Sequence, residues 1–253
     1  MALNWKSAQK SEKLFWKNIY INKIFDKAYV AGSNEQYIGF VKEIFKRHKI
    51  NIKKINKKVL LDLGSGPYGL IKGLTFIEKK NKLKIKSLIA IDPLMNFYKK
   101  KINLLKQDSH LRLITGSGEN IPLKNNSVDF LFCTNVIDHC SLPSKVIDES
   151  ARVLSNNGVF CPSVHVIYPY LNLFRPLLKY IDKNHPHHFS EKYFEKMLKK
   201  NFSIVQKTFS ATIIKDQPSF TFSNIFSDYN FFKNLKRAIS NYIVYTIYYV
   251  CKK

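Results

Sequence analysis

The stretch that decides the fold reads Val59-Leu60-Leu61-Asp62-Leu63-Gly64-Ser65-Gly66-Pro67-Tyr68-Gly69. Its apolar residues suit a buried parallel strand, and the strand breaks into a glycine-rich turn just after an acid. Gly64 and Gly66 allow a tight turn and leave room for a ligand against the backbone. A second apolar run, 88–91, also ends in an acid, Asp92, which is placed to accept hydrogen bonds from ribose hydroxyls. Together these segments predict a site for a nucleoside-containing cofactor.

Apolar runs and helical patterns alternate downstream of this stretch. Strands are expected at 59–63, 87–91, 111–115, 128–134 and 158–165, with a helix after each of the first four. Such alternation predicts a parallel sheet with right-handed crossovers. Ligands of open α/β sheets lie outside the carboxyl ends of the strands, at the switch in strand order. Glycine and polar residues fall at these ends, which predicts that they converge on one site.

Four segments in this order resemble the motifs of a known family. They are Asp62–Gly66, Glu119–Leu123, Asn135–His139 and Ala151–Phe160. Over about residues 57 to 165 the sequence resembles the class I S-adenosylmethionine-dependent methyltransferases, of the small-molecule type that carries methyltransferase domain 11. The resemblance implies an α/β fold: a Rossmann-like, doubly wound, mostly parallel seven-stranded sheet with an antiparallel last strand.

The same resemblance implies S-adenosyl-L-methionine as the cofactor and assigns residues to it. The implied cofactor-binding residues are Asp62, Gly64, Ser65, Gly66, Asp92, Pro93, Gly118, Glu119, Asn135 and Val136. The sequence departs from the family pattern at two positions. Tyr68 stands where the family usually has a third glycine, and Ser117 stands where an acid often contacts the adenine amine. Glu119 or a backbone amide is therefore expected to substitute at the adenine.

The flanking segments suggest the rest of the organisation. Helical periodicity at 11–24 and 36–48 predicts a helical cap over 1–56, which is either a lid on the acceptor site or a helix packed on the sheet. The methyltransferase domain is expected to span 57–253. It includes a helix at 191–200, a strand from 202, an aromatic-rich insertion at about 213–240 and a final strand at 243–251.

The composition is strongly basic, with 42 Lys and Arg against 18 Asp and Glu and a formal net charge of +24. Nearly all of this charge is lysine, whereas bidentate readout of phosphate and bases favours arginine. A solvated surface is therefore preferred to a nucleic-acid groove. The four cysteines show no C-x-x-C spacing, no secretory signal opens the chain, and no apolar run is long enough to span a membrane. These features predict a cytoplasmic protein and leave its oligomeric state open.

Histidines supply the candidates for a general base. His187 and His188 lie in a loop that this topology places over the acceptor site, and His139 follows the fourth strand. The alternative is that a histidine before a helix start only bonds the backbone. Asp138-His139 also resembles the E-x-x-E-H metal segment of certain quinone-pathway O-methyltransferases. Asn135 stands where that segment has its first acid, so no metal is expected.

Methyl transfer from a sulfonium is an in-line displacement, so alignment supplies much of the acceleration and a base adds to it for a hydroxyl or amine acceptor. The sequence therefore predicts methyl transfer to a small molecule, at oxygen, in a biosynthetic pathway. Two alternatives stay open: methylation of tRNA or rRNA, and a cofactor-binding subunit without turnover.

Overall fold

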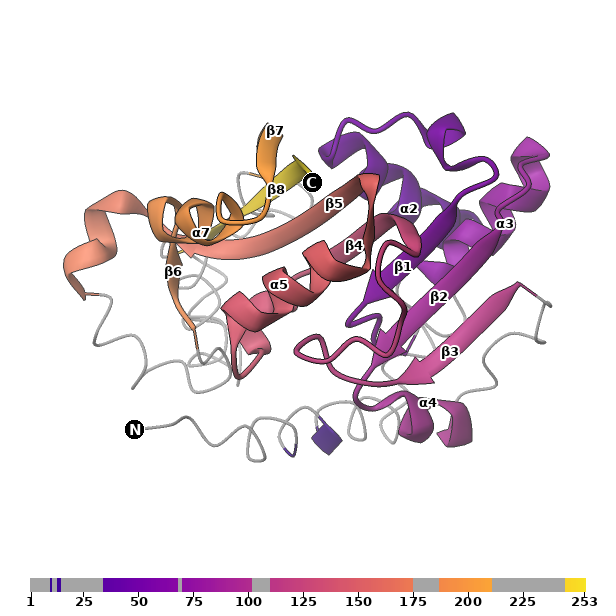
Figure 1. The fold of residues 1–253 in the computed structure, drawn as a ribbon, viewed down its shortest axis with the longest axis horizontal. Helices are drawn as coiled ribbons and strands as arrows, with labels where there is room; N and C mark the ends of the chain where they lie inside the picture. Colours follow the sequence, from indigo (N-terminus) through magenta and orange to yellow (C-terminus); the bar gives the residue numbers. More distant parts are fainter. Residues whose placement is uncertain are drawn as a thin grey trace, which may run out of the picture.

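The computed structural model describes residues 10, 13–14, 34–67, 70–101, 110–174, 187–210 and 244–253. In these ranges one mixed sheet is flanked by helices on both faces (Figure 1). The strands are β1 (Val59–Leu63), β2 (Ser87–Asp92), β3 (Leu111–Thr115), β4 (Val128–Thr134), β5 (Leu154–Ile167), β6 (Phe189–Ser190), β7 (Ser203–Ser210) and β8 (Val244–Lys252). The α-helices are α2 (Asn34–Arg47), α3 (Ile71–Asn81), α4 (Met95–Lys101), α5 (Pro143–Val153) and α7 (Glu191–Leu198), with 3-10 turns η2 (Ile52–Ile55), η3 (Ile137–His139) and η4 (Pro169–Phe174).

The main path of the sheet runs β3-β2-β1-β4-β5-β8-β7. The first five strands pair in parallel, and β8 is antiparallel to both β5 and β7. This confirms the predicted Rossmann-like sheet and its antiparallel last strand. The two-residue strand β6 pairs with β5 and adds an eighth strand to the seven predicted.

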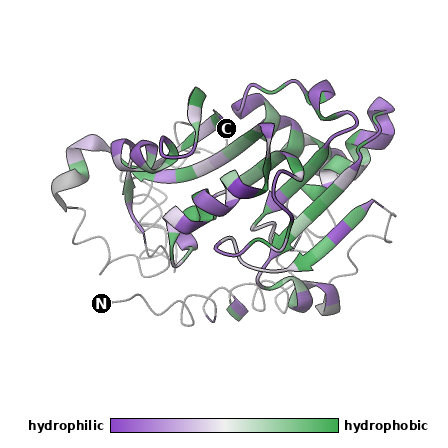
Figure 2. Ribbon diagram, in the orientation of Figure 1, coloured by the Kyte–Doolittle hydropathy of each residue, from purple (hydrophilic) through white to green (hydrophobic). Residues whose placement is uncertain are grey.

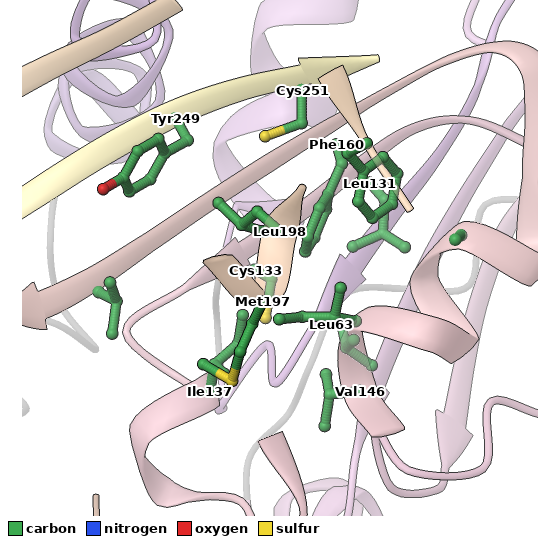
Figure 3. Packing of buried hydrophobic residues seen from close by; sticks show 14 of the residues in the cluster. Leu63, Leu131, Cys133, Ile137, Val146, Phe160, Met197, Leu198, Tyr249 and Cys251 are labelled. Carbon is green, nitrogen blue, oxygen red and sulfur yellow. The ribbon is translucent and has the colours of Figure 1, made fainter. Parts of the chain in front are cut away.

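The apolar alternation of the strands fills a core on each face of the sheet. On one face α2 and α3 cover β1, β2 and β4, and on the other face α5 and α7 cover β4, β5 and β8. Figure 2 shows the central strands as hydrophobic and the outer sides of α5 and α7 as hydrophilic. Figure 3 shows that the second core reaches the end of β1, where Leu63 lies beside Val146 of α5. Packed side chains of this core thus fix the position of the carboxyl end of β1.

One predicted helix is wrong. Residues 116–127, all of which are described, connect β3 to β4 through turns and an isolated bridge between Ser117 and Asn120. Gly116, Gly118 and Pro122 disfavour a helix in so short a connection.

Other boundaries differ by a few residues. β5 begins at Leu154, four residues before the predicted start, and α7 ends at Leu198 instead of 200. Most of the predicted helix 11–24 and all of the insertion 213–240 lie outside the described residues. In the part of the chain that is described, no helix is long and apolar enough to cross a membrane.

Candidate functional site

The glycine turn after β1 forms the centre of the site. Gly64 and Gly66 have φ of +69° and +60°, in the left-handed region that favours glycine. The Gly64 N–H donates to the carbonyl of Ile91 at 2.7 Å, which ties the turn to the end of β2. A Cβ on residue 64 would lie 2.3 Å from Cγ2 of Val136, so this residue, two positions after the end of β4, packs directly on the glycine. The structure therefore brings Gly64 and Val136 together, although 72 positions of sequence separate them.

Asp92, at the end of β2, holds the turn in place. Its Oδ2 accepts the Gly66 N–H at 2.9 Å and its Oδ1 accepts the Leu94 N–H at 2.8 Å. The side chain is 6% exposed. An ionised carboxylate offers about four acceptor positions, so a carboxylate can hold a backbone and accept from ribose hydroxyls together. Asp92 thereby shapes the backbone on which a cofactor would lie, and its contact with a ribose stays a prediction.

Asp62 orients the segment that enters α3. Its Oδ2 accepts the Leu70 N–H at 2.7 Å, and the residue is 4% exposed. Burial raises the pKa of Asp62 to about 7; the Leu70 bond opposes this rise, and the charge of Asp92 adds to it. The two acids thus share one region of the molecule. The contact of Asp62 with the cofactor remains a prediction, because its visible partner is the backbone.

This raised pKa predicts a pH-dependent stability. A buried acid whose pKa is raised on folding stabilises the protein below its unfolded pKa, and that contribution is lost as the pH rises through about 7. Asp62→Asn keeps an oxygen for Leu70 but cannot ionise. Relative to the wild type, its free energy of unfolding should therefore rise between pH 5 and pH 8, by at most about 2.7 kcal/mol.

Urea unfolding at both pH values measures the difference. Asp129→Asn is the matched control, because Asp129 accepts the N–H of Val59 at the other end of β1. Its offset from the wild type should be the same at pH 5 and pH 8. A constant offset for Asp62→Asn as well would contradict the prediction.

Arg152 and Glu149 of α5 clamp the connection between β3 and β4. The Arg152 guanidinium donates to both carboxylate oxygens of Glu149 at 2.8 Å and to the carbonyls of Ile121 and Leu123. Glu149 in turn accepts the Ile121 N–H at 2.9 Å. The clamp fixes the segment that carries Gly118 and Glu119. Sequence reasoning did not assign this role, although Arg152 lies in one of the family motifs.

Gly118 and Glu119 are thereby set beside α5. A Cβ on Gly118 would meet Val146 at 3.0 Å, so the loop lies flat on the helix. One carboxylate oxygen of Glu119 accepts the N–H groups of Ser141 and Leu142 and the Ser141 hydroxyl. This oxygen anchors the start of α5, so an adenine contact by Glu119 would fall to its second oxygen.

The remaining predicted cofactor residues lie at the same edge of the sheet. Asn135 has φ of +53°, and its N–H donates to Ser163 of β5 at 3.0 Å, so the chain turns sharply as it leaves β4. Ser65 is buried, with its N–H directed at the Ile91 carbonyl, and Pro93 directly follows Asp92. The tips of β1, β2 and β4 thus meet where the strand order reverses between β1 and β4.

His187 lies against η3, at this same edge. Its N–H donates to the Asp138 carbonyl at 3.3 Å, and its Nε2 lies 2.9 Å from the Cys140 carbonyl. A carbonyl only accepts, so Nε2 carries the hydrogen and the neutral ring keeps its lone pair on Nδ1. Burial lowers the pKa of His187 below its ordinary 6.5, although the bond to Cys140 and the charge of Asp138 oppose this.

The other two histidine candidates flank this contact. His139 is the last residue of η3 and His188 follows His187 in the chain. All three candidates are therefore gathered around one turn after β4. Among the described residues, no group of three or more His, Cys, Asp and Glu side chains is arranged to hold a metal ion.

Known proteins resemble this chain in sequence. Residues 61–161 match a sequence family described as a methyltransferase domain. A thiol S-methyltransferase of Rattus norvegicus, TMT1B, is 31% identical over 132 residues, 51% of this chain and 51% of that protein. The chain thus spans about half the length of this curated relative.

Solved structures share the fold at low sequence identity. The geranyl diphosphate C-methyltransferase of Streptomyces coelicolor A3(2) aligns with a TM-score of 0.60 at 10% identity, over 85% of this chain and 77% of that one. A phospholethanolamine N-methyltransferase of Haemonchus contortus aligns with a TM-score of 0.57 at 16% identity, over 85% of this chain and 52% of that one. Residues 61–161 of this chain thus match a methyltransferase domain, and the sheet that they build has the fold of solved methyltransferases.

Proposed function

We propose that this chain transfers a methyl group from S-adenosyl-L-methionine to a small-molecule acceptor. The observation that carries the proposal is the meeting of the β1, β2 and β4 tips around a glycine turn that is bonded to Asp92. Two solved neighbours, the geranyl diphosphate and the phospholethanolamine methyltransferases, were crystallised with S-adenosylhomocysteine.

The residues present fit this cofactor. Asp92 would accept the ribose hydroxyls, and the bare backbone at Gly64 and Gly66 would allow a close approach. Gly118 and Glu119 would border the adenine, and Asn135 would border the methionine part. When bound, the cofactor supplies a methyl group on a positively charged sulfur. The chain's own residues align the acceptor with it and take up the acceptor's proton.

His187 favours an acceptor whose proton must be removed. Its Nδ1 holds a lone pair, and its lowered pKa keeps the ring neutral near pH 7. A hydroxyl needs such a base, whereas a thiol, with a pKa of about 8.5, ionises more readily by itself. Transfer to oxygen is therefore proposed, and the similarity to TMT1B makes a thiol the second candidate.

The place of the lysines argues against an RNA acceptor. A dense group of exposed lysines, from Lys53 to Lys57 and from Lys79 to Lys86, lies at the amino ends of β1 and β2. The Lys57 N–H donates to the Lys84 carbonyl at 2.6 Å, so these two segments adjoin. The proposed site lies at the opposite, carboxyl ends, and this basic surface therefore does not border it.

Calorimetry with S-adenosylmethionine and S-adenosylhomocysteine tests the cofactor first. Incubation of the protein with labelled cofactor and a metabolite extract then tests turnover, with mass spectrometry for products that gain CH2. Binding without any labelled product would support the non-catalytic subunit, and absence of binding would overturn the proposal.

His187→Gln tests the base. With a hydroxyl acceptor, kcat should fall about 100-fold or more, because the proton has lost its acceptor. With a thiol acceptor the loss should be less than about tenfold. The wild-type rate should rise with pH through the lowered pKa of His187 and level off above it, and the variant should lack this limb.

His110→Gln is the control, because His110 pairs with Glu78 on the far side of the sheet from η3. It should turn over at the wild-type rate. An unchanged kcat and pH profile in His187→Gln on a hydroxyl acceptor would remove His187 from the mechanism. His139 and His188 would then be tested in the same way.

A further inference from the structure

A buried carboxylate lies beside the proposed base. Asp138, in the middle of η3, is 1% exposed. Its Oδ1 is buried and has no hydrogen-bond partner among the residues that the structure describes. Burying an uncompensated polar or charged atom is costly, so such groups in a folded protein call for an explanation.

His187 is a group near Asp138 that can take the opposite charge. The backbone of His187 is bonded to the carbonyl of Asp138 itself, and the charge of Asp138 acts on the His187 ring. The Nε2 of the ring lies 2.9 Å from the Cys140 carbonyl. His188 also acts on the His187 ring, Asp138 acts on the Cys133 thiol, and His139 adjoins Asp138 in η3. Burial raises the pKa of that thiol well above its usual range, so it stays neutral.

We propose that Asp138 is a positioning residue for His187: its buried carboxylate stabilises the imidazolium that forms when the imidazole takes a proton from the acceptor. This inference rests on the proposed function. It assigns the pair to acceptors that carry an O–H or N–H proton.

The step balances without a further reactant. The acceptor X–H forms the X–CH3 bond as the sulfur–carbon bond of the donor breaks and its electron pair stays on sulfur. The proton passes from X to Nδ1 of His187 and leaves to solvent after the product. The positive charge that leaves the sulfonium thus reappears on the imidazolium, next to the Asp138 carboxylate. An interaction that strengthens only as this charge develops accelerates the step.

The test reads the histidine itself and needs no acceptor. Ring NMR of the full chain, with the His187 signal assigned by its loss in His187→Gln, gives the pH midpoint of His187. In Asp138→Asn this midpoint should fall by about one pH unit, a tenfold weaker affinity for the proton. In Asp138→Glu, which keeps the charge, the His187 midpoint should fall by no more than half as much. The His110 signal in the same spectra should be identical in all variants.

A His187 midpoint that is unchanged in Asp138→Asn would overturn the inference. If that variant does not fold, Asp138→Ser decides, because it also removes the charge and must lower the His187 midpoint as well. With an acceptor in hand, Asp138→Asn should lower kcat about tenfold and leave the affinity for S-adenosylhomocysteine unchanged. A wild type that binds no S-adenosylhomocysteine would sink the proposed function, whereas the NMR titration would still report on the pair.

Discussion

Gly64→Ala is expected to eliminate detectable binding of S-adenosylhomocysteine and to lower the free energy of unfolding by about 2–4 kcal/mol. Two causes act together. The new methyl group would lie 2.3 Å and 2.5 Å from the two γ carbons of Val136, and the residue would have to keep φ at +69°. The turn can relieve both only by moving, and moving it displaces the backbone N–H of Gly66 from Asp92. Calorimetry and urea unfolding measure the two effects.

Two further variants separate the causes. Val136→Ala removes both clashing carbons, so the double variant with Gly64→Ala should be more stable than Gly64→Ala alone. The destabilisation that remains in the double variant then measures the cost of the positive φ at residue 64. Gly73→Ala is the control for stability alone, because its Cβ would lie 2.4 Å from the Tyr37 carbonyl, where α3 meets α2. It should destabilise the protein and leave the affinity of the folded protein intact. Wild-type affinity in Gly64→Ala would show that the ligand does not lie on this turn.

Asp92→Asn is expected to weaken S-adenosylhomocysteine binding about 100-fold. The amide would turn an NH2 group toward the N–H of either Gly66 or Leu94, and one of these bonds would be lost. The charge that strengthens hydrogen bonds from ribose hydroxyls would be lost as well. Charge-assisted hydrogen bonds are worth about 1.5–3 kcal/mol, and the upper part of this range corresponds to a loss of affinity of about 100-fold.

Asp129→Asn again serves as the control, because Asp129 is a carboxylate that accepts a backbone N–H at the amino end of β1, away from the site. Its affinity for S-adenosylhomocysteine should equal that of the wild type. If Asp92→Asn binds within threefold of the wild type, the ribose lies elsewhere.

The parts of the fold that follow from local rules could be predicted from the sequence. The stretch around Asp62 and Gly64 combines a buried apolar run, an acid and two glycines, and each of these acts on its own neighbours in the chain. The resemblance to the family then gave the sheet, its antiparallel last strand and the cofactor. The sheet and its antiparallel last strand are confirmed.

The parts that depend on contacts between distant segments could not be predicted. The shape of the β3–β4 connection is held by Arg152, some 30 residues later, through the carbonyls of Ile121 and Leu123. The charge of Asp138 beside His187 joins segments that no periodicity links. Spacing along one sequence does not encode such pairs, so the roles of the histidines stay predictions.

The position of β8 has a consequence for how the protein is made. β8 follows β7 in the chain, but in the sheet it lies between β5 and β7. During synthesis β7 leaves the ribosome before β8, the strand with which it pairs. Until β8 follows, the edge of β5 that pairs with β8 is also unpaired. The nascent chain therefore cannot complete this half of the sheet until β8 emerges, so closure of the sheet is a late event governed by contacts between distant segments.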